Sequence, residues 1–351
     1  MVVQTSPKMP PEECIRLEDK AAGLDGYIVI HSSARGPAAG GCRLWTYDDP
    51  AAALTDAMRL AEGMSYKNAM AELPLGGGKA VLRRPAGNFD RRALFEAFGK
   101  AVAQLDGRYV TAEDVGTGVE DMEAVALHTS HVAGRTARPG FAGGDPSPWT
   151  ALGVFEAMKA AFAFRHGGAS LNGATVAVQG VGSVGAGLCR LLAAEGAKLV
   201  LADIVDARVA ALAAELGGTV VPIAEIAGVE ADVFAPCALG GALDMATLDA
   251  MRARIVCGAA NNQLATPEIA DELLARDITY APDYVVNAGG IINVAAEYLG
   301  ENESEVRARV LAIGPRTTAI LEKARDEGKS SSFVADREAE RLMSREVLES
   351  L

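Results

Sequence analysis

The 351-residue sequence has no apolar run long enough to cross a lipid bilayer, because charged residues interrupt every hydrophobic stretch. Residues 1–19, MVVQTSPKMPPEECIRLED, also lack the basic start and the apolar centre of a secretory signal peptide. Basic side chains are outnumbered, with 33 Lys and Arg against 46 Asp and Glu, which gives a net charge of −13. A nucleic acid or an anionic membrane would favour a basic surface, so we expect neither as a partner.

The sequence also has few cysteines and few histidines, which limits its covalent and metal chemistry. Its five cysteines form no C-x-x-C pair and are odd in number, which favours buried thiols in a reducing cytoplasm over a disulfide framework. Of the four histidines, His128 and His131 have helical spacing, but no cluster of Asp, Glu or Cys completes a set of metal ligands. We therefore expect no metal, and any catalytic apparatus must work largely without histidine.

Length and hydrophobic patterning indicate two α/β domains, each long enough to bury a core. Apolar residues Leu54, Met58 and Ala61 predict the buried face of a helix over 49–63. A second helix is predicted to begin at Asp90, its N-cap, and to run to about residue 105. Strands are predicted in the first half over 26–33, 38–47, 79–85 and 108–115.

The second half shows a similar alternation. A Gly- and Pro-rich stretch over 133–148 is predicted to connect the domains or to form a loop facing a cleft between them. After a helix from Thr150, strands alternate with helical patterns, including a helix over 206–216 and a last strand-like run over 278–285. Strands separated by helices in this way indicate a parallel sheet.

The most informative single motif is a glycine fingerprint within residues 176–203, VAVQGVGSVGAGLCRLLAAEGAKLVLAD. Gly180, Gly182 and Gly185 follow a β-branched strand and precede a helix, which is the context of a dinucleotide-binding turn. The first glycine permits the tight turn, the second admits a pyrophosphate, and the third lets helix and strand pack closely. Asp203 ends the next strand, where a carboxylate accepts from the adenosine ribose, and no arginine adjoins it. We therefore predict NAD rather than NADP; a glycine turn that binds no nucleotide is the alternative.

A second glycine-rich segment, LPLGGGKAVL at residues 73–82, invites comparison with a phosphate loop. Ala80 follows Gly78–Lys79 where such a loop has Ser or Thr, so this is not a nucleotide loop. Lys79 and Lys67 lie in neighbourhoods with few other charges. In a dry cleft the pKa of an ammonium falls, so it can exchange protons near neutrality, and a second ammonium can hold a carboxylate. Asp114 ends a predicted strand, where α/β enzymes place chemistry. Surface lysines and a turn aspartate are the alternatives.

Seven segments, in unchanged order over about residues 20–345, resemble one family. They are GPAAGGCRLWTY, GMSYKNAM…LPLGGGKAV, GRYVTAEDVGT, VAVQGVGSVG, DVFAPCALGG, GAANNQL and YAPDYVVNAGGIINV. They are similar to the amino-acid dehydrogenases of the glutamate/leucine/phenylalanine/valine family, and most similar to its leucine-specific members. The resemblance implies reversible oxidative deamination, in which an L-amino acid, water and NAD give a 2-oxo acid, ammonia and NADH.

The resemblance also implies an architecture. It predicts an N-terminal α/β domain (1–140) for substrate binding and oligomerisation, and a C-terminal Rossmann domain (141–319) for NAD, separated by a cleft. The C-terminal helices, 320–351, are expected to return to the first domain. A cytoplasmic homo-oligomer is expected, of a size that the sequence leaves open.

Roles for individual residues follow from the same resemblance. Lys67 would pair with the substrate carboxylate, and Lys79 would activate the water that attacks the iminium carbon. Asp114 would exchange protons with the amino nitrogen, and the glycine triplet before Lys79 would leave room for the substrate. Further substrate contacts are implied at Ala39, Gly40, Gly77, Gly78, Ala112, Asn261, Ile291 and Val294. Cofactor contacts are implied at Arg43, Thr150, Gly180, Val181, Gly182, Ser183, Val184, Gly185, Asp203, Ile204, Cys237, Ala238, Ala259, Ala260 and Asn261.

The implied side-chain pocket is apolar, which excludes glutamate because its second carboxylate would be buried without a cation. Ala112 and Val294 resemble the leucine-specific members. Ala39 stands where those members have a larger aliphatic residue, so a smaller wall could admit phenylalanine, and Cys42 replaces a threonine. One methylene changes preference by only ~1–3 kcal/mol, so Leu, Val, Ile and Phe all stay open, with branched chains first. A catalytically silent NAD-binding regulator is the hypothesis from another class.

Overall fold

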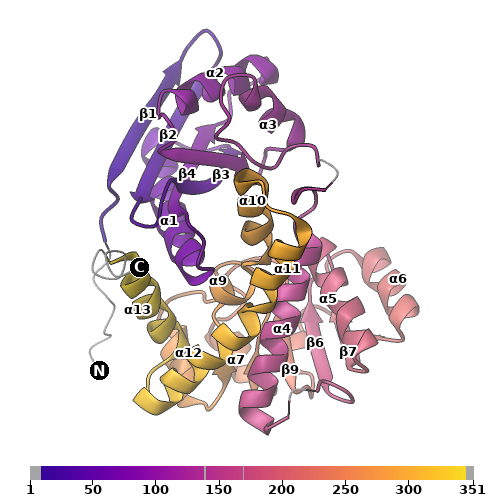
Figure 1. Ribbon diagram of the computed structural model, residues 1–351. Coiled ribbons are helices and arrows are strands. Elements are labelled where there is room, and N and C mark those ends of the chain that lie inside the picture. Colours follow the sequence, from indigo (N-terminus) through magenta and orange to yellow (C-terminus); the bar gives the residue numbers. More distant parts are fainter. Residues whose placement is uncertain (1–8, 138–139, 169, 345–351) are drawn as a thin grey trace. The chain divides into compact units, whose positions relative to one another are not determined.

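The computed structural model describes residues 9–137, 140–168 and 170–344, which form two compact units (Figure 1). The N-terminal unit holds the described residues of 9–144, 291–306 and 338–344, and the central unit holds those of 145–290 and 307–337. Whether these units correspond to the predicted functional domains 1–140 and 141–319 stays a prediction.

The N-terminal unit is built on a mixed sheet. Its strand order is β1-β2-β4-β3-β5. Strand β2 pairs antiparallel with β1 and β4, and β3 pairs parallel with β4 and β5. The elements are β1 (Glu13–Asp19), β2 (Leu24–Ser32), β3 (Ala38–Trp45), α1 (Pro50–Met70), β4 (Gly76–Arg83), α2 (Arg91–Ala103), β5 (Tyr109–Glu113) and α3 (Val119–Ala126).

Alternation along the strands divides this sheet into two buried faces. Val29 and Val81 pack against α1, whereas Ala80 and Leu82 belong to a cluster that includes side chains of α2 and α3. Because successive side chains of a strand point to opposite faces, Lys79 lies on the same face as Val81, under α1. Figure 1 shows α1 on one side of the sheet and α2 and α3 on the other.

Helix α1 is longer than predicted and buries a different face. It continues through Gly63 to Met70, so Lys67 lies in its last turn instead of following the helix. Its buried residues include Ala53, Ala57 and Ala61, while Met58 is 38% exposed. Alanines let the helix approach the sheet closely, and the larger apolar residues flank the contact. Of the three residues predicted on the buried face, only Ala61 is fully buried.

Other local predictions are confirmed or corrected. Asp90 caps α2 by accepting a hydrogen bond from the Ala93 amide, as predicted. The strand predicted from residue 79 begins three residues earlier, so the glycines of LPLGGGKAVL belong to β4. Strand β1 was not predicted.

The central unit contains a fully parallel sheet, which confirms the prediction. Its order is β8-β7-β6-β9-β10-β11, which in chain order is the 3-2-1-4-5-6 arrangement of a Rossmann fold. The elements are α4 (Ser147–His166), β6 (Thr175–Gln179), α5 (Ser183–Ala194), β7 (Lys198–Ala202), α6 (Asp206–Leu216), β8 (Thr219–Val220), the 3-10 helix η1 (Ile226–Gly228), β9 (Val233–Pro236), α7 (Met245–Ala250), β10 (Ile255–Val256), α8 (Ile269–Ala275), β11 (Thr279–Tyr280), α9 (Asp283–Val286) and α12 (Ile313–Glu327).

The helix predicted over 206–216 is confirmed as α6. The strand-like run over 278–285 is wrong beyond Tyr280, because Pro282 precedes the short helix α9. Three further helices carry residues of both units: α10 (Gly289–Leu299), α11 (Glu303–Leu311) and α13 (Ser331–Met343). The helices expected to return to the first domain are thus divided, since 307–337 belongs to the central unit and 338–344 to the N-terminal one.

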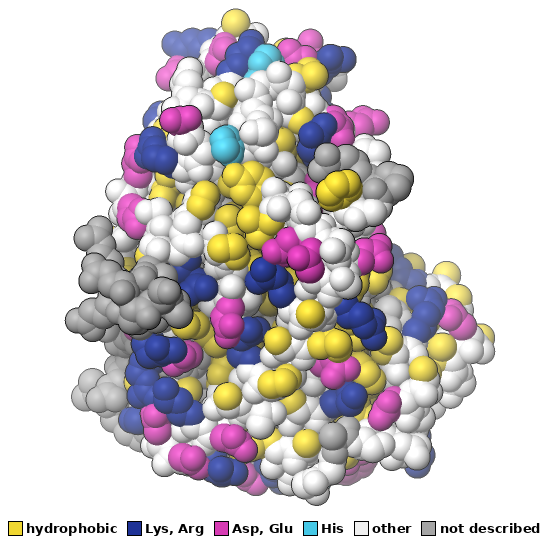
Figure 2. Space-filling model, viewed as in Figure 1, with side chains coloured by type: hydrophobic (Ala, Val, Ile, Leu, Met, Phe, Trp, Pro, Cys, Tyr) yellow, Lys and Arg dark blue, Asp and Glu magenta, His cyan; other side chains and the backbone are white. Residues whose placement is uncertain are grey.

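Surface charge on the face shown in Figure 2 is mixed, with Lys and Arg side chains interspersed among Asp and Glu. The excess of acidic residues is therefore not gathered there into one patch. None of the helices among the described residues combines the length and the hydropathy that a membrane span requires.

Candidate active site

Lys79 and Asp114, predicted as the catalytic pair, meet in the N-terminal unit. Lys79 Nζ lies 3.0 Å from Asp114 Oδ2, and the lysine side chain is only 6% exposed. Lys79 is held by β4, and Asp114 directly follows β5. Thr117 fixes the loop after β5, because its hydroxyl accepts from the Asp114 amide and donates to the Cys42 carbonyl of β3. The ammonium and the carboxylate are thus fixed by three neighbouring strands.

A second set of ion pairs supports this one. Arg43 Nε donates to the same Asp114 oxygen at 3.1 Å, and Arg43 Nη1 donates to Asp56 Oδ2 at 2.9 Å. The Tyr47 hydroxyl donates to Asp56 Oδ2 at 2.6 Å, and Arg59 pairs with the other Asp56 oxygen at 2.9 Å. Arg43 was predicted as a cofactor contact only, and Asp56 was not predicted at all. The one feature of the sequence that could have pointed to Asp56 is its position between Ala53 and Ala57, which are buried on the side of α1 that packs on the sheet.

The cations hold both carboxylates in their ionised form. Burial raises the pKa of Asp114, but Lys79 and then Arg43 outweigh burial, so the pKa lies below its usual value. Burial likewise opposes ionisation of Asp56, whose pKa is nevertheless lowered by Tyr47, Arg59 and Arg43. Burial raises the pKa of the Cys42 thiol well above its usual value, so it stays protonated beside this cluster.

The glycine triplet before Lys79 has a structural reason of its own. A Cβ at Gly77 would lie 2.1 Å from the Ser65 amide nitrogen of α1, and one at Gly76 would lie 2.0 Å from the Ser32 carbonyl oxygen. At Gly78 a Cβ would meet the Val29 carbonyl at 2.9 Å. The expectation that the triplet leaves room for the substrate is therefore corrected: the chain itself occupies the space of the missing side chains.

Lys67 lies in the last turn of α1, two residues after Ser65, which packs against Gly77. Its neighbour Asn68 is fully buried, and the Asn68 amide donates to the Gly76 carbonyl at 2.6 Å and to the Ala39 carbonyl at 3.3 Å. The turn that carries Lys67 is thereby fixed to β3 and β4.

The predicted substrate pocket residues of this unit lie on adjacent elements. Ala39 pairs with Gly77 across β3 and β4, and Ala112 pairs with Gly41 across β3 and β5. The Gly40 carbonyl accepts from the buried Tyr109 hydroxyl at 2.6 Å.

The two remaining pocket positions, Ile291 and Val294, lie on α10 and are partly buried. This helix is hydrogen-bonded to the backbone of Gly134 and Gly143 in the N-terminal unit. The Asn293 amide exchanges hydrogen bonds with the Gly143 backbone, and Glu297 accepts from the Gly134 amide at 2.9 Å.

The glycine fingerprint lies in the central unit, at the carboxyl end of β6. Gly180 has φ +96°, and its Cβ would lie 2.7 Å from the Ala238 side chain, so the turn requires glycine. A Cβ at Gly185 would lie 2.1 Å from the Gly180 carbonyl oxygen. At Gly182 a Cβ would meet nothing within 4 Å. Only this second glycine opens onto free space, which fits the position that admits a pyrophosphate.

Asp203 lies at the end of β7 and supports the fingerprint turn. Its oxygens accept from the Val181 amide at 2.7 Å and from the Val205 amide at 2.9 Å, and its side chain is 5% exposed. Each carboxylate oxygen can accept more than one hydrogen bond, so acceptor capacity remains for a ribose. Ile204 beside it is 82% exposed.

One point of the prediction about Asp203 needs correction. An arginine is present after all: Arg208 of α6 lies 3.6 Å from Asp203 Oδ2. The absence of an arginine therefore cannot be used to favour NAD over NADP.

The other predicted cofactor residues are also in the central unit. Thr150 lies in the first turn of α4 and donates to the Pro146 carbonyl at 3.1 Å. Cys237 directly follows β9, and burial raises its pKa to about 12. Sequence reasoning missed Asn287, whose amide donates to Asn261 Oδ1 at 2.9 Å and to the Ala259 carbonyl at 3.1 Å. Ala238, Ala259, Ala260 and Asn261 lie in the loops after β9 and β10, next to the fingerprint end of the sheet.

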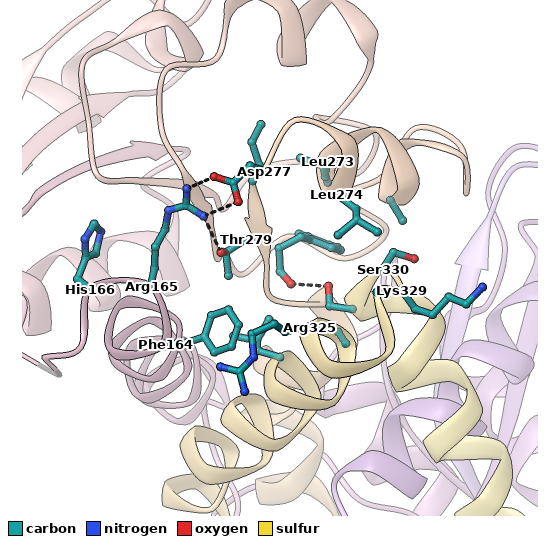
Figure 3. A pocket seen from close by; sticks show the side chains of 17 residues that line it. Phe164, Arg165, His166, Leu273, Leu274, Asp277, Thr279, Arg325, Lys329 and Ser330 are labelled. Atoms are coloured by element: carbon teal, nitrogen blue, oxygen red, sulfur yellow. Dashed lines mark hydrogen bonds and ion pairs between the residues drawn. The ribbon is translucent and has the colours of Figure 1, made fainter.

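Figure 3 shows a pocket of about 560 Å³ elsewhere in the central unit, between α8 and the ends of α4 and α12. Phe164 and Leu273 contribute apolar surface, and Arg165 pairs with Asp277 at 2.6 Å on its wall. It includes none of the residues predicted for substrate or cofactor, so it is not the candidate active site.

Comparison with known proteins identifies the family to which the chain is similar. The family model described as "Glu/Leu/Phe/Val dehydrogenase, dimerisation domain" matches residues 11–131, and that described as "Glutamate/Leucine/Phenylalanine/Valine dehydrogenase" matches residues 205–331. The chain is 44% identical to a leucine dehydrogenase of Bacillus cereus, over 94% of this chain and 90% of that enzyme. It is 45% identical to a valine dehydrogenase of Streptomyces albus, over 95% and 92% of the two chains.

Among solved structures, an L-tryptophan dehydrogenase from Nostoc punctiforme matches with a TM-score of 0.85 and 38% identity, over 95% of this chain and 96% of that one. Enzymes of this kind use a nicotinamide cofactor, and the open position at Gly182 fits one. The two matched models, the identity over nearly the whole chain and the paired Lys79 and Asp114 lead to one conclusion: the chain belongs to the Glu/Leu/Phe/Val dehydrogenase family and is an amino-acid dehydrogenase.

Proposed function

We propose that the protein catalyses the reversible, NAD-dependent oxidative deamination of branched-chain L-amino acids, with leucine preferred. The observation that carries the proposal is the pair of buried Lys79 and partly buried Asp114 at 3.0 Å, because it provides an amine and a carboxylate for two separate proton transfers. The high identity to leucine and valine dehydrogenases supports the branched-chain substrate.

In the proposed reaction, Lys67 binds the substrate carboxylate and Asp114 takes a proton from the substrate ammonium. A bound NAD would supply the hydride acceptor, and loss of the hydride from the α-carbon would convert the substrate to an iminium ion. Lys79, acting as the neutral amine, then takes a proton from a water molecule that attacks the iminium carbon. Asp114 returns its proton to the nitrogen of the resulting carbinolamine. As the C–N bond breaks, the hydroxyl proton passes to the Asp114 carboxylate, so that ammonia leaves and the 2-oxo acid forms. No step requires histidine.

NAD is proposed because Asp203 stands where its carboxylate would accept from the ribose and would repel a 2′-phosphate. Residues 180–185 would hold the pyrophosphate through their backbone amides, at the N-terminus of α5. Asn261, held by Asn287, would position the substrate beside the nicotinamide. We further propose a homo-oligomer, which the "dimerisation domain" description of residues 11–131 supports, in a reducing cytoplasm.

A second candidate substrate class is aromatic. Ala39 leaves one wall of the implied pocket small, and the similar Nostoc punctiforme structure is a tryptophan dehydrogenase. Leucine is placed first because the leucine and valine enzymes share 44–45% of their residues with this chain, against 38% for the tryptophan enzyme.

A substrate panel tests the proposal. NADH formation is followed with Leu, Val, Ile, Phe, Trp and Glu, each with NAD and with NADP. We expect the highest kcat/KM for Leu with NAD and none measurable for Glu. A kcat/KM for Phe or Trp above that for Leu would show that the protein prefers aromatic amino acids, contrary to the proposal.

A variant tests the mechanism. Lys79→Ala should lower kcat by at least ~10³-fold, because a general base contributes about 10²–10⁴-fold and the Asp114 carboxylate also loses one of its two cationic partners. NADH affinity, measured by fluorescence, should change less than about twofold, since Lys79 is not among the predicted cofactor contacts. If kcat and NADH binding fell together, Lys79 would be a structural residue and the proposed role would be wrong.

A further inference from the structure

The ion pairs of Asp114 continue beyond the two predicted catalytic groups. Asp56 of α1, Arg43 of β3, Asp114 after β5 and Lys79 of β4 form a row in which negative and positive charges alternate. The four side chains are 18%, 20%, 23% and 6% exposed, in that order, so the row is shielded from bulk water along its length. Partly buried pairs of this kind are screened much less than pairs on the surface.

The arginine of this row is fixed at two points. Arg43 donates from Nε to Asp114 at 3.1 Å and from Nη1 to Asp56 at 2.9 Å, so two carboxylates define the plane of its guanidinium group. Asp56 is fixed in turn by the Tyr47 hydroxyl and by Arg59. A lysine could replace the charge of Arg43 but could not reproduce a planar fork between two acids.

We propose that Arg43 is a positioning residue for Asp114 and that Asp56 holds Arg43 in place, an inference that rests on the proposed role of Asp114 as proton carrier. Arg43 and Lys79 both bind Oδ2, whereas Oδ1 receives no hydrogen bond from the described residues. The pairs therefore aim the carboxylate and leave Oδ1 for the substrate nitrogen.

The charges that act on Asp114 come from Lys79 and Arg43, with Asp56 behind Arg43. Cys42 and Tyr109 lie close enough to interact with Asp114, but burial raises the pKa of both, so they stay neutral. The two cations therefore keep the carboxylate ionised, as it must be to accept a proton from an ammonium. This role adds to the cofactor contact that the resemblance implies for Arg43.

Variants at Asp56 test the proposal without altering a group that touches substrate or cofactor. Asp56→Ala removes the anchor of Arg43, and Asp56→Asn is the milder change to use if the alanine variant does not fold. The matched control is Arg59→Gln, which removes a partner of Asp56 on Oδ1, whereas Arg43 binds Oδ2. Arg43→Lys keeps the charge and removes the fork.

We expect kcat for leucine to fall about 10-fold or more in Asp56→Ala and Arg43→Lys, because a misplaced catalytic group is costly in rate. In Asp56→Ala, KM for leucine and Kd for NADH should stay within about twofold of the wild type, as should all constants of Arg59→Gln. An unchanged kcat in Asp56→Ala would overturn the proposal. So would a parallel loss of NADH affinity, since Asp56 would then act through the cofactor.

A readout that does not need activity separates this inference from the proposed function. If the wild type formed no NADH with any amino acid of the panel, the proposed function would fail by itself. Urea midpoints of Arg43→Gln, Asp114→Asn and the double variant would still report whether the two side chains are coupled. A double variant less destabilised than the sum of the singles supports the pairing, and additive shifts would overturn it.

Discussion

The two glycine-rich segments of this protein look alike in sequence and differ in what surrounds them. In residues 76–78, every added Cβ would collide with the protein itself, with Ser32, with Ser65 or with Val29. In the fingerprint 180–185, two glycines are needed for the turn and the helix contact, but Gly182 opens onto free space. Glycines therefore mark close packing in the first segment, and in the second they include one position, Gly182, that faces open space.

The two segments also differ in the polar groups that lie near them: charged side chains near the first and backbone N–H groups near the second. Lys79, Asp114 and Arg43 lie on or beside the sheet that contains the first segment. Beside the second, the Asp203 carboxylate is tied to backbone amides, and the groups offered to a ligand are backbone N–H groups at a helix start. The proposed function therefore places proton transfer on side chains of the N-terminal unit and cofactor binding on backbone groups of the central unit.

Of the variants that test the difference between the two segments, Gly77→Ala is expected to have the largest effect on stability. Its Cβ would lie 2.1 Å from the Ser65 nitrogen and 2.3 Å from the Ser65 Cα, both backbone atoms, so α1 must move from the sheet. We expect the free energy of unfolding to fall by about 3 kcal/mol or more, measured by urea denaturation. A loss below about 1 kcal/mol would mean that the segment has spare room after all.

The next effect concerns the charges and depends on pH. The pKa of Asp114 is lowered by folding, so its ionised form stabilises the protein above about pH 4, and this contribution is lost as pH falls through the folded pKa. Asp114→Asn should therefore cost about 2 kcal/mol at pH 7, a cost that shrinks below about pH 4. Urea midpoints of both proteins from pH 3 to 7 measure it. If the stability difference between the wild type and Asp114→Asn did not change with pH, the ion pair could not be its cause.

Gly182→Ala should affect binding and leave folding nearly unchanged. No atom lies within 4 Å of the added Cβ, so the free energy of unfolding should change by less than about 1 kcal/mol. The methyl group would occupy space that the pyrophosphate needs, and Kd for NADH should rise at least ~10-fold, or ~1.4 kcal/mol. Fluorescence titration and urea denaturation on the same sample provide both values. Unchanged NADH affinity would remove the contrast between the two segments.

The smallest effect is expected from Gly63→Ala, which serves as the control for Gly77→Ala. Gly63 lies in the same helix α1, is exposed, and would have nothing within 4 Å of a Cβ. Alanine has the higher helix propensity, so the free energy of unfolding should rise by about 0.5–1 kcal/mol. A destabilised Gly63→Ala would indicate that α1 needs glycine for a reason other than packing.

The parts of the fold that sequence predicted well have local causes. The helix over 206–216, the cap at Asp90 and the parallel sheet around the fingerprint all depend on periodicity or on neighbours in the chain. Helix α1 was ended too early because Gly63 weakens a helical pattern. That glycine is tolerated because the contacts on both sides of it, from Ala53 to Asn68, are made with the sheet.

The parts that sequence could not predict depend on partners distant in the chain. Glycines have low strand propensity, so β4 could not be extended to Gly76 without knowing that β2 and β3 flank it. In the site, Lys79 and Asp114 could be proposed because each ends or begins a recognisable segment. The ion pair between Arg43 and Asp56 could not be predicted, because it depends on how β3 is positioned against α1 in the folded protein.

The path of the chain through its two units has a practical consequence. Within residues 9–344 it passes from one unit to the other four times, after Gly144, Gly290, Val306 and Arg337. A protease that cuts after Gly144 separates residues 9–144 from the rest of the chain, and they then stay attached only through their non-covalent contacts with it, including those with 291–306 and 338–344. Truncation at residue 144 would strip the first half of the helix segment that carries Ile291 and Val294, so neither half can be excised or swapped as a simple cassette.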